Sequence, residues 1–328
     1  MKRFLIKRFS IMLFSIMAMS LVSFWIIELP PGDYLSMYIR QLELRGELVS
    51  ESRIEALRVQ FGFGEPFFTR YYRWVSGIVT RGDFGISFAW RQPVSHLLTE
   101  RLPATIMISL ATMIFTFLVA IPVGIYSSTH QYSIGDYIAT VFGFIGLATP
   151  PFLLALFLMY SLFTYFNFPV GGLFSEEFRH APWTIARFFN LLQHLTVPVI
   201  ITGMAGTAAN IRQVRATMLD ELNKDYVTTA RVKGLAERKL IAKYPVRVAF
   251  NPIWSTVGWL LPAIISGAAI VDVVLNMPTI GPLLLGSLQS QDMYLAGSII
   301  LIMTILTLIG TFISDIILAI SDPRIRYE

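Results

Sequence analysis

The sequence contains no cysteine, and only 14% of its 328 residues are charged. Without cysteine, a disulfide framework, a thiolate metal site and a cysteine nucleophile are all excluded. Soluble domains carry about 25% charged residues, whereas 55% of this chain is hydrophobic. The composition therefore indicates a membrane protein, and we expect an all-α fold with helical spans.

Sequence motifs for hydrolytic or metal chemistry are also absent. The four histidines lie far apart and form no H-E-x-x-H pair; they are His96, His130, His180 and His194. The chain has no G-x-S-x-G elbow and no G-x-x-x-x-G-K-[ST] phosphate loop. We therefore expect a chain that neither hydrolyses ATP nor cleaves proteins, and that binds no metal or other cofactor itself.

Six apolar stretches are long enough to cross a bilayer, which requires about 20 helical residues. The fourth is expected to be the shortest, because Gly203 and Gly206 dilute it. No small-residue cleavage site follows the first stretch, so we interpret it as an uncleaved anchor. The six stretches are residues 9–29, 104–125, 137–165, 195–211, 253–275 and 294–320.

The positive charges indicate how the chain is oriented. All six lysines fall within residues 2–7 and 224–243, whereas residues 276–293 carry no lysine or arginine. Lysine and arginine concentrate in cytoplasmic loops, so we predict that both termini lie in the cytoplasm. Clustering beside apolar runs also argues against a basic face for nucleic acid.

The long loop after the first span is predicted to be an extracytoplasmic subdomain of short helices and turns. Residues 36–61 have helix-like spacing, and a glycine-rich aromatic stretch with a turn at residues 82–85 follows. The predicted organisation is an N-terminal basic segment and first helix (1–29), this loop subdomain (30–103), and a five-span core (104–328) that contains a cytoplasmic loop (212–252).

Prolines interrupt several predicted spans, and each removes a backbone donor that lipid cannot replace. The freed carbonyls must face other helices, hydroxyl groups or a water-filled path. Kinks that help an irregular bundle to pack and kinks that open a path are equally compatible with this pattern. The prolines are Pro122, Pro150, Pro151, Pro198 and Pro262.

Three acidic residues lie in or near the spans. Asp315 precedes the cytoplasmic end of the last span, and Glu28 and Asp272 lie near outer ends. Pairing or snorkelling at an interface explains them more simply than a proton relay does.

The basic segment DYVTTARVKGLAERKL (residues 225–240) stands out between two apolar stretches. Helical spacing puts Thr229, Ala230 and Lys233 on roughly one face, and Gly234 then interrupts the helix. The small residues Ala230 and Gly234 would let a neighbouring protein approach the backbone closely. A basic loop that only sets topology is an equally good interpretation from composition alone.

The order of these features resembles the membrane permease subunits of bacterial ABC importers, in the dipeptide/oligopeptide/nickel branch. The resemblance covers the whole chain and includes Pro31-Gly32-Asp33 and the terminal Asp322–Tyr327 segment. Further matching stretches are FGFGEPFFTRYYRW (61–74), GDFGIS (82–87), ERLPATIMISL (100–110) and LNMPTIGPLL (275–284).

Within this resemblance, the cytoplasmic loop matches the family's "EAA" coupling motif in altered form. Thr228 occupies the glutamate position and Thr229 the first alanine position, while Ala230 and Gly234 are kept. The resemblance implies a type I importer permease fold with six transmembrane helices. It implies that the ATPase-coupling residues are Asp225, Tyr226, Thr228, Thr229, Ala230, Arg231, Lys233, Gly234 and Leu235. Pro150, Pro151 and Pro262 are candidates for the substrate path because of the carbonyls that they free.

The resemblance also implies partners in the bacterial inner membrane. These are a second homologous permease, two ATPase subunits (identical or a heterodimer) that bind ATP and Mg²⁺, an extracytoplasmic substrate-binding protein and membrane lipid. Peptides are the expected substrates, with oligosaccharides or other conjugates as the alternative. An ion-coupled secondary transporter would need carboxylates near the midplane and often inverted repeats. An intramembrane enzyme or a scaffold is disfavoured by the missing catalytic groups.

Overall fold

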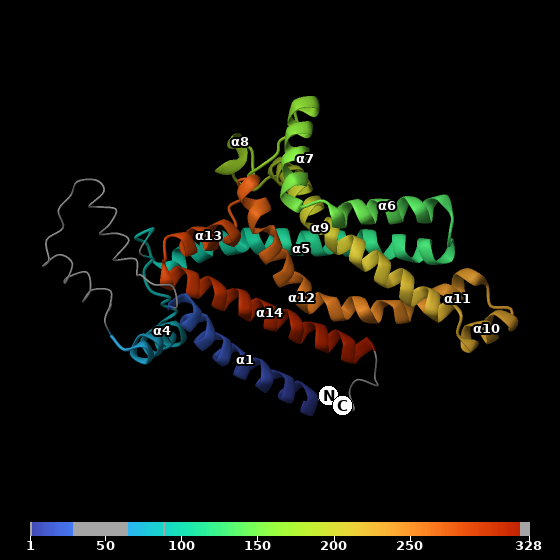
Figure 1. The fold of residues 1–328 in the computed structure, drawn as a ribbon, viewed down its shortest axis with the longest axis horizontal. Coiled ribbons are helices and arrows are strands. Elements are labelled where there is room, and N and C mark those ends of the chain that lie inside the picture. Colours follow the sequence, from blue (N-terminus) through green and yellow to red (C-terminus); the bar gives the residue numbers. More distant parts are fainter. Residues whose placement is uncertain (1, 29–64, 88, 322–328) are drawn as a thin grey trace, which may run out of the picture. The chain divides into compact units, whose positions relative to one another are not determined.

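The computed structural model describes residues 2–28, 65–87 and 89–321, and the side chains of residues 2, 26–28, 258–267 and 321 lie outside that description. This part of the chain is helical, with one isolated bridge between Ile86 and Pro93. The predicted helix at 36–61 and the terminal motifs at 31–33 and 322–327 lie outside the described residues. The helices (Figure 1) are α1 (Lys2–Glu28), α4 (Phe67–Arg81), α5 (Val94–Thr129), α6 (Ile134–Ala148), α7 (Pro151–Phe166), α8 (Glu176–Arg179), α9 (Ile185–Leu222), α10 (Asp225–Val232), α11 (Glu237–Lys243), α12 (Pro245–Val274), α13 (Ile280–Gln289) and α14 (Met293–Ser321).

These helices form two compact units, and α1, α5 and α14 each contribute residues to both. The first unit contains Met1–Phe9, Thr105–Pro278 and Leu306–Glu328. The second contains Ser10–Ala104 and Thr279–Ile305.

Four described helices are long and apolar enough to cross a membrane. Helices α6 and α7 make a fifth span if they are counted together, although they are bent by 106° at the break between them (Figure 1). The third predicted span is therefore two short helices rather than one. The four unbroken candidates are Arg3–Trp25, Val94–Thr129, Ile185–Leu222 and Met293–Ile320.

The fourth predicted span belongs to α9, which has 38 residues, so the expectation that it is the shortest was wrong. Its glycines reflect close packing rather than weak helix formation. A Cβ added at Gly203 would lie 2.9 Å from the ring of Phe115 on α5. A Cβ added at Gly124 on α5 would lie 2.7 Å from Cβ of Val214 on α9. Small residues at such crossings let membrane helices approach each other closely.

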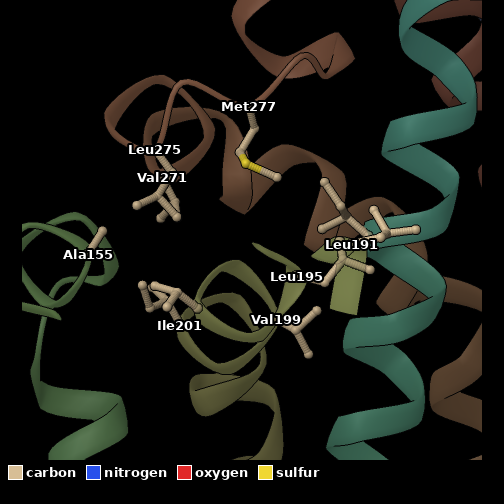
Figure 2. Packing of buried hydrophobic residues seen from close by; sticks show 10 residues of the cluster. Ala155, Leu191, Leu195, Val199, Ile201, Val271, Leu275 and Met277 are labelled. Atoms are coloured by element: carbon tan, nitrogen blue, oxygen red, sulfur yellow. The ribbon is translucent and has the colours of Figure 1, made fainter. Parts of the chain in front are cut away.

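The core of the first unit is an apolar cluster shared by α7, α9 and α12 (Figure 2). Leu195 and Ile201 of α9 pack with Ala155 of α7 and with Val271 of α12. Because lipid is as apolar as these side chains, van der Waals packing rather than exclusion of water stabilises such contacts within the bilayer. Helix α9 also contacts α6, which makes it the central helix of this unit.

Asp315 forms the expected pairing within the first unit. Its Oδ2 lies 3.1 Å from Nη1 of Arg8. A carboxylate and a guanidinium that neutralise each other can be accommodated near the edge of a span at lower cost than either alone.

In the second unit, a buried carboxylate connects the GDFGIS segment to α14. Gly82 ends α4 with a φ of 64°, and the Asp83 carboxylate then accepts a hydrogen bond from the Gly85 N–H at 2.8 Å. Ser87 donates to Oδ2 of Asp292 at 2.5 Å, while Oδ1 of Asp292 accepts from the Leu295 N–H at 3.2 Å. Asp292 therefore caps α14 and fixes the segment at the same time.

Candidate functional site

The loop singled out in the sequence folds as a short helical hairpin of α10 and α11 between α9 and α12 (Figure 1). Asp225 lies in the first turn of α10, where a negative charge interacts favourably with the helix dipole. Gly234 follows the last turn with a φ of 80°. The Gly234 N–H donates to the Arg231 carbonyl at 3.0 Å, and the Leu235 N–H donates to the Ala230 carbonyl at 3.2 Å. This pair of bonds is a Schellman motif, which explains the requirement for glycine.

The hairpin has a small apolar core of its own. Val227 and Leu240 are fully buried, and Ala230 is 9% exposed between them. Leu235 and Tyr244 pack against the same cluster. The small side chain of Ala230 therefore accommodates the chain's own second helix, whereas the sequence suggested that it admits a neighbouring protein.

The opposite side of α10 is open. Tyr226, Thr228, Thr229 and Val232 are exposed, and Val232 is 83% exposed. Asp225, Arg231, Lys233 and Gly234 are exposed as well. The packed core of the hairpin thus supports an outward surface that contains hydroxyl groups, charged groups and the apolar side chain of Val232.

One ion pair and one hydrogen bond order this surface. Arg231 donates through Nε and Nη2 to the two carboxylate oxygens of Glu237, at 3.1 and 2.8 Å. Hydrogen bonds from Arg231 are the largest cause that lowers the pKa of Glu237, and the same bonds raise the pKa of Arg231. Tyr226 donates to Glu221. Burial, followed by the hydrogen bond to that carboxylate and its charge, raises the pKa of Tyr226 to about 12.

Val232 was missed by sequence reasoning, although a signal was present. Val227 and Ala230 are three residues apart and define the buried side of α10. Val232 does not continue that spacing, so it is an apolar residue on the outward side of a polar helix.

The predicted path residues Pro150 and Pro151 lie at the bend between α6 and α7. Pro150 precedes the first residue of α7 and Pro151 is that residue. Since neither proline has an N–H, the carbonyls of Gly146 and Leu147 have no helical donor four residues later. Two carbonyl groups within a broken span are thus left for other polar partners. Pro262 lies in α12, and its side chain is outside the described residues.

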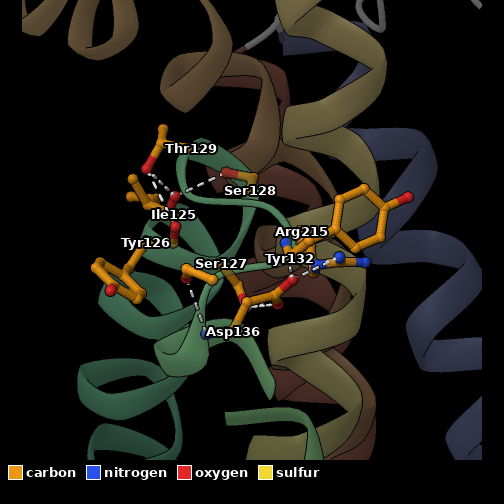
Figure 3. A network of polar contacts seen from close by, with 9 residues as sticks. Ile125, Tyr126, Ser127, Ser128, Thr129, Tyr132, Asp136 and Arg215 are labelled. Atoms are coloured by element: carbon orange, nitrogen blue, oxygen red, sulfur yellow. Dashed lines mark hydrogen bonds and ion pairs between the residues drawn. The ribbon is translucent and has the colours of Figure 1, made fainter. Parts of the chain in front are cut away.

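A buried polar network fastens the beginning of α6 to α9 (Figure 3). Asp136 is 3% exposed, and its Oδ2 accepts from Nη2 of Arg215 at 2.9 Å and from the Tyr132 N–H at 3.0 Å. Its Oδ1 accepts a hydrogen bond from Ser127, at the end of α5. The carboxylate therefore joins three helices of the first unit near the end of α9 that continues into α10.

Comparisons with known proteins agree with this architecture. Residues 120–327 match the family described as binding-protein-dependent transport system inner membrane component, and residues 1–111 match the family of the N-terminal part of this membrane component. The oligopeptide transport system permease protein AppB of Bacillus subtilis is 33% identical over 310 residues, which cover 93% of each chain. The dipeptide transport system permease protein DppB of Escherichia coli K12 is 27% identical over 100% of both chains.

The chain belongs to the family of inner membrane components of binding-protein-dependent transport systems. It is a permease subunit of the ABC transporter class, located in the inner membrane, and it is a transport component without enzymatic activity of its own.

Proposed function

We propose that this chain is one of two homologous permeases in an ATP-driven importer, and that it forms half of the path for peptides delivered by an extracytoplasmic binding protein. The two relatives are an oligopeptide and a dipeptide permease, which supports peptides over oligosaccharides or other conjugates. In this assembly, ATP and Mg²⁺ are bound by two ATPase subunits, which are either identical or different.

The proposed topology has six spans and both termini in the cytoplasm. The four unbroken candidates, the bent pair α6–α7 and the 30-residue helix α12 are compatible with six crossings. The lysines on both sides of α10 and in α11 favour a cytoplasmic position for this hairpin.

The proposed coupling element is the α10–α11 hairpin, docked on an ATPase subunit. The observation that carries this proposal is the combination of a packed core, formed by Val227, Ala230 and Leu240, with an outward surface that contains Val232. A rigid projection transmits displacement, whereas a flexible loop would absorb it. The residues proposed for coupling are Asp225, Tyr226, Thr228, Thr229, Ala230, Arg231, Val232, Lys233, Gly234 and Leu235.

The proposed path includes the bend at Pro150 and Pro151, while Pro262 stays a candidate on sequence grounds. The two carbonyl groups without helical donors are suited to water or to the amide groups of a passing peptide. An ion-coupled mechanism gains no support from Asp315, because that carboxylate is paired with Arg8.

Sidedness and docking can be tested together, because the chain has no cysteine of its own. Single-cysteine variants Thr228→Cys and Glu176→Cys both replace exposed residues. A membrane-impermeant maleimide should label Thr228→Cys only in inside-out vesicles and Glu176→Cys only in right-side-out vesicles. Adding the ATPase subunits should slow labelling of Thr228→Cys at least severalfold and leave Glu176→Cys, the matched control, unchanged.

Labelling of Thr228→Cys from the outside would contradict the topology, and full labelling in the presence of bound ATPase would contradict the docking surface. Uptake by the assembled transporter separates the remaining alternatives. Uptake that continues without ATP and stops with a protonophore would identify a secondary transporter. Competition by oligosaccharides but not by peptides would overturn the assignment of the substrate class.

A further inference from the structure

Helix α4 of the second unit presents three different strips along its surface. One strip is turned toward the protein: Phe67, Tyr71, Trp74 and Ile78 belong to the cluster around Phe24 of α1. A second strip is apolar and exposed, and the third is polar and exposed. The second strip consists of Phe68, Tyr72 and Val79, which are 72%, 75% and 78% exposed, and the third consists of Thr69, Arg73 and Thr80.

The contacts of α4 place it beside the last turns of a membrane span. The ring of Phe24 lies 5.4 Å from the rings of Phe67 and Trp74, measured between centroids. The hydroxyl of Tyr71 lies 2.7 Å from Oγ of Ser20. Ser20 and Phe24 belong to the apolar segment Arg3–Trp25, and Ser20 lies about 12 Å along the helix axis from Glu28, the end of α1. Helix α4 is therefore at the depth of the outermost part of this span.

The length and strip pattern of α4 define its orientation. Its 15 residues extend about 22 Å, which is too short to cross about 30 Å of hydrocarbon. The apolar strip runs from Phe68 to Val79 and the polar strip from Thr69 to Thr80, so both environments continue along the whole helix. A helix that ran across the interface would instead change from apolar to polar along its length. The axis of α4 thus lies in the plane of the interface.

The charges on α4 have a single sign. The helix contains Arg70, Arg73 and Arg81 and no aspartate or glutamate. Arg70 is directed at the sulfur of Met293, whereas Arg73 and Arg81 are exposed, and Arg73 also pairs with Glu65 just before the helix at 2.9 Å. Guanidinium groups bind phosphate oxygens in a bidentate manner and are more weakly hydrated than ammonium groups. A helix with an apolar strip, a polar strip and only positive charges fits a surface of phospholipid.

We propose that α4 is an interfacial helix whose strip of Phe68, Tyr72 and Val79 is inserted among the acyl chains of the bilayer, with the exposed Arg73 and Arg81 at the lipid phosphates. Lipid covers these side chains permanently. A binding protein that docks and leaves would return three large apolar side chains to water in every cycle, at a cost of about 25 cal/mol per Å². The assignment to the outer leaflet rests on the proposed topology, whereas contact with lipid does not.

Neighbouring residues on α4 provide a matched pair for the test. Val79→Cys and Thr80→Cys are prepared in the complete transporter and labelled with an environment-sensitive nitrobenzoxadiazole dye. The proteoliposomes consist of phosphatidylethanolamine and phosphatidylglycerol, with or without phosphatidylcholine that carries a doxyl group at carbon 5. The doxyl lipid should quench the dye at position 79 at least twofold more than the dye at position 80, and external iodide should show the reverse order.

Three other quenching results would contradict either the lipid contact of α4 or the proposed topology. Quenching of both dyes by iodide and of neither by doxyl lipid overturns the proposal. A dye at position 79 that iodide reaches until purified binding protein is added identifies a protein-docking surface, which also overturns it. If position 80 is quenched only by iodide trapped inside the vesicles, lipid contact stands and the proposed topology fails.

Discussion

Helices α4 and α10 have similar construction and different surroundings. Each is a short amphipathic helix that packs one strip against its own unit and ends before a glycine in the left-handed region, Gly82 or Gly234. Their exposed sides differ. Helix α4 exposes Phe68, Tyr72 and Val79, whereas the main exposed aliphatic side chain of α10 is Val232 among threonines and charges.

The difference separates two kinds of exposed apolar surface in a membrane protein. A continuous apolar strip is stable only where something apolar always covers it, and lipid is always present. A single valine among polar groups is tolerated in water, so it suits a surface that a cytosolic partner covers. The two strongly exposed valines, Val79 and Val232, therefore have different proposed partners.

The largest effect is expected for Ala230→Glu, which would place a carboxylate against Val227 and Leu240. Burial of an unpaired charge should destabilise the hairpin by about 2 kcal/mol or more and lower uptake at least tenfold. Thr229→Glu adds the same charge to the exposed side and serves as the control for folding. Thermal unfolding of the purified subunit and uptake in proteoliposomes are the measurements. Equal stability of both variants would show that the core of the hairpin is unimportant.

A charge should lower stability at Val79 and uptake at Val232. Val79→Asp should destabilise the subunit in lipid by about 1–2 kcal/mol, because a carboxylate would replace an apolar group at the interface. Val232→Asp should leave stability within about 0.5 kcal/mol and reduce uptake severalfold. The conservative variants Val79→Thr and Val232→Thr control for side-chain shape. Identical responses of the two aspartate variants would remove the distinction between the helices.

The two terminal glycines should respond in the same way. Neither Gly82 nor Gly234 would bring an added Cβ within 4 Å of another atom, so Gly→Ala should produce only the backbone strain of the left-handed region. That strain is about 1 kcal/mol and should lower the melting temperature by about 2 °C. Gly→Asn at each position should cost less, because asparagine tolerates this conformation. A large loss at only one glycine would reveal a second role there.

The smallest effect is expected for Glu237→Gln, because the side chains of Glu237 and Arg231 are exposed to solvent, which weakens their ion pair. Since the pKa of Glu237 is lowered in the folded protein, its stabilising contribution is present above the ordinary glutamate pKa of 4.5. That contribution is lost as the pH falls below 4.5 and through the lowered pKa. Melting temperatures of the wild-type subunit and Glu237→Gln should therefore differ slightly at pH 7 and converge at low pH. A difference that grows with acidification would contradict this assignment.

The sequence predicted elements more reliably than their contacts. The apolar runs located four helices that are long and apolar enough to cross a membrane, and Gly234 marked the end of α10 because few other residues adopt a positive φ. The bend at Pro150 was visible only as two prolines, since the angle between α6 and α7 depends on how α7 packs against α9 and α12. The extent of α9 was underestimated, because Gly203 looked like a weakness and is instead a contact with Phe115.

The candidate sites were predicted to different degrees. The proposed coupling segment was chosen from its polarity and its motif, and its coupling role stays a prediction. The inward position of Ala230 depends on the partner residue Leu240, which is distant in helical spacing. The lipid-facing strip of α4 was not predicted. Phe67, Phe68, Tyr71 and Tyr72 are all aromatic, so composition alone does not separate the pair that faces the protein from the pair that is exposed.

Helix α9 has a mechanical consequence. Its 38 residues make a rod of about 57 Å, and two residues separate its end from α10. A tilt of about 5° around the C-terminal end of α9 would move its N-terminal end by about 5 Å, which is roughly the diameter of a peptide backbone. In the proposed topology, α9 would act as a lever that converts a small displacement of the α10–α11 hairpin into a larger one at the other end of the span.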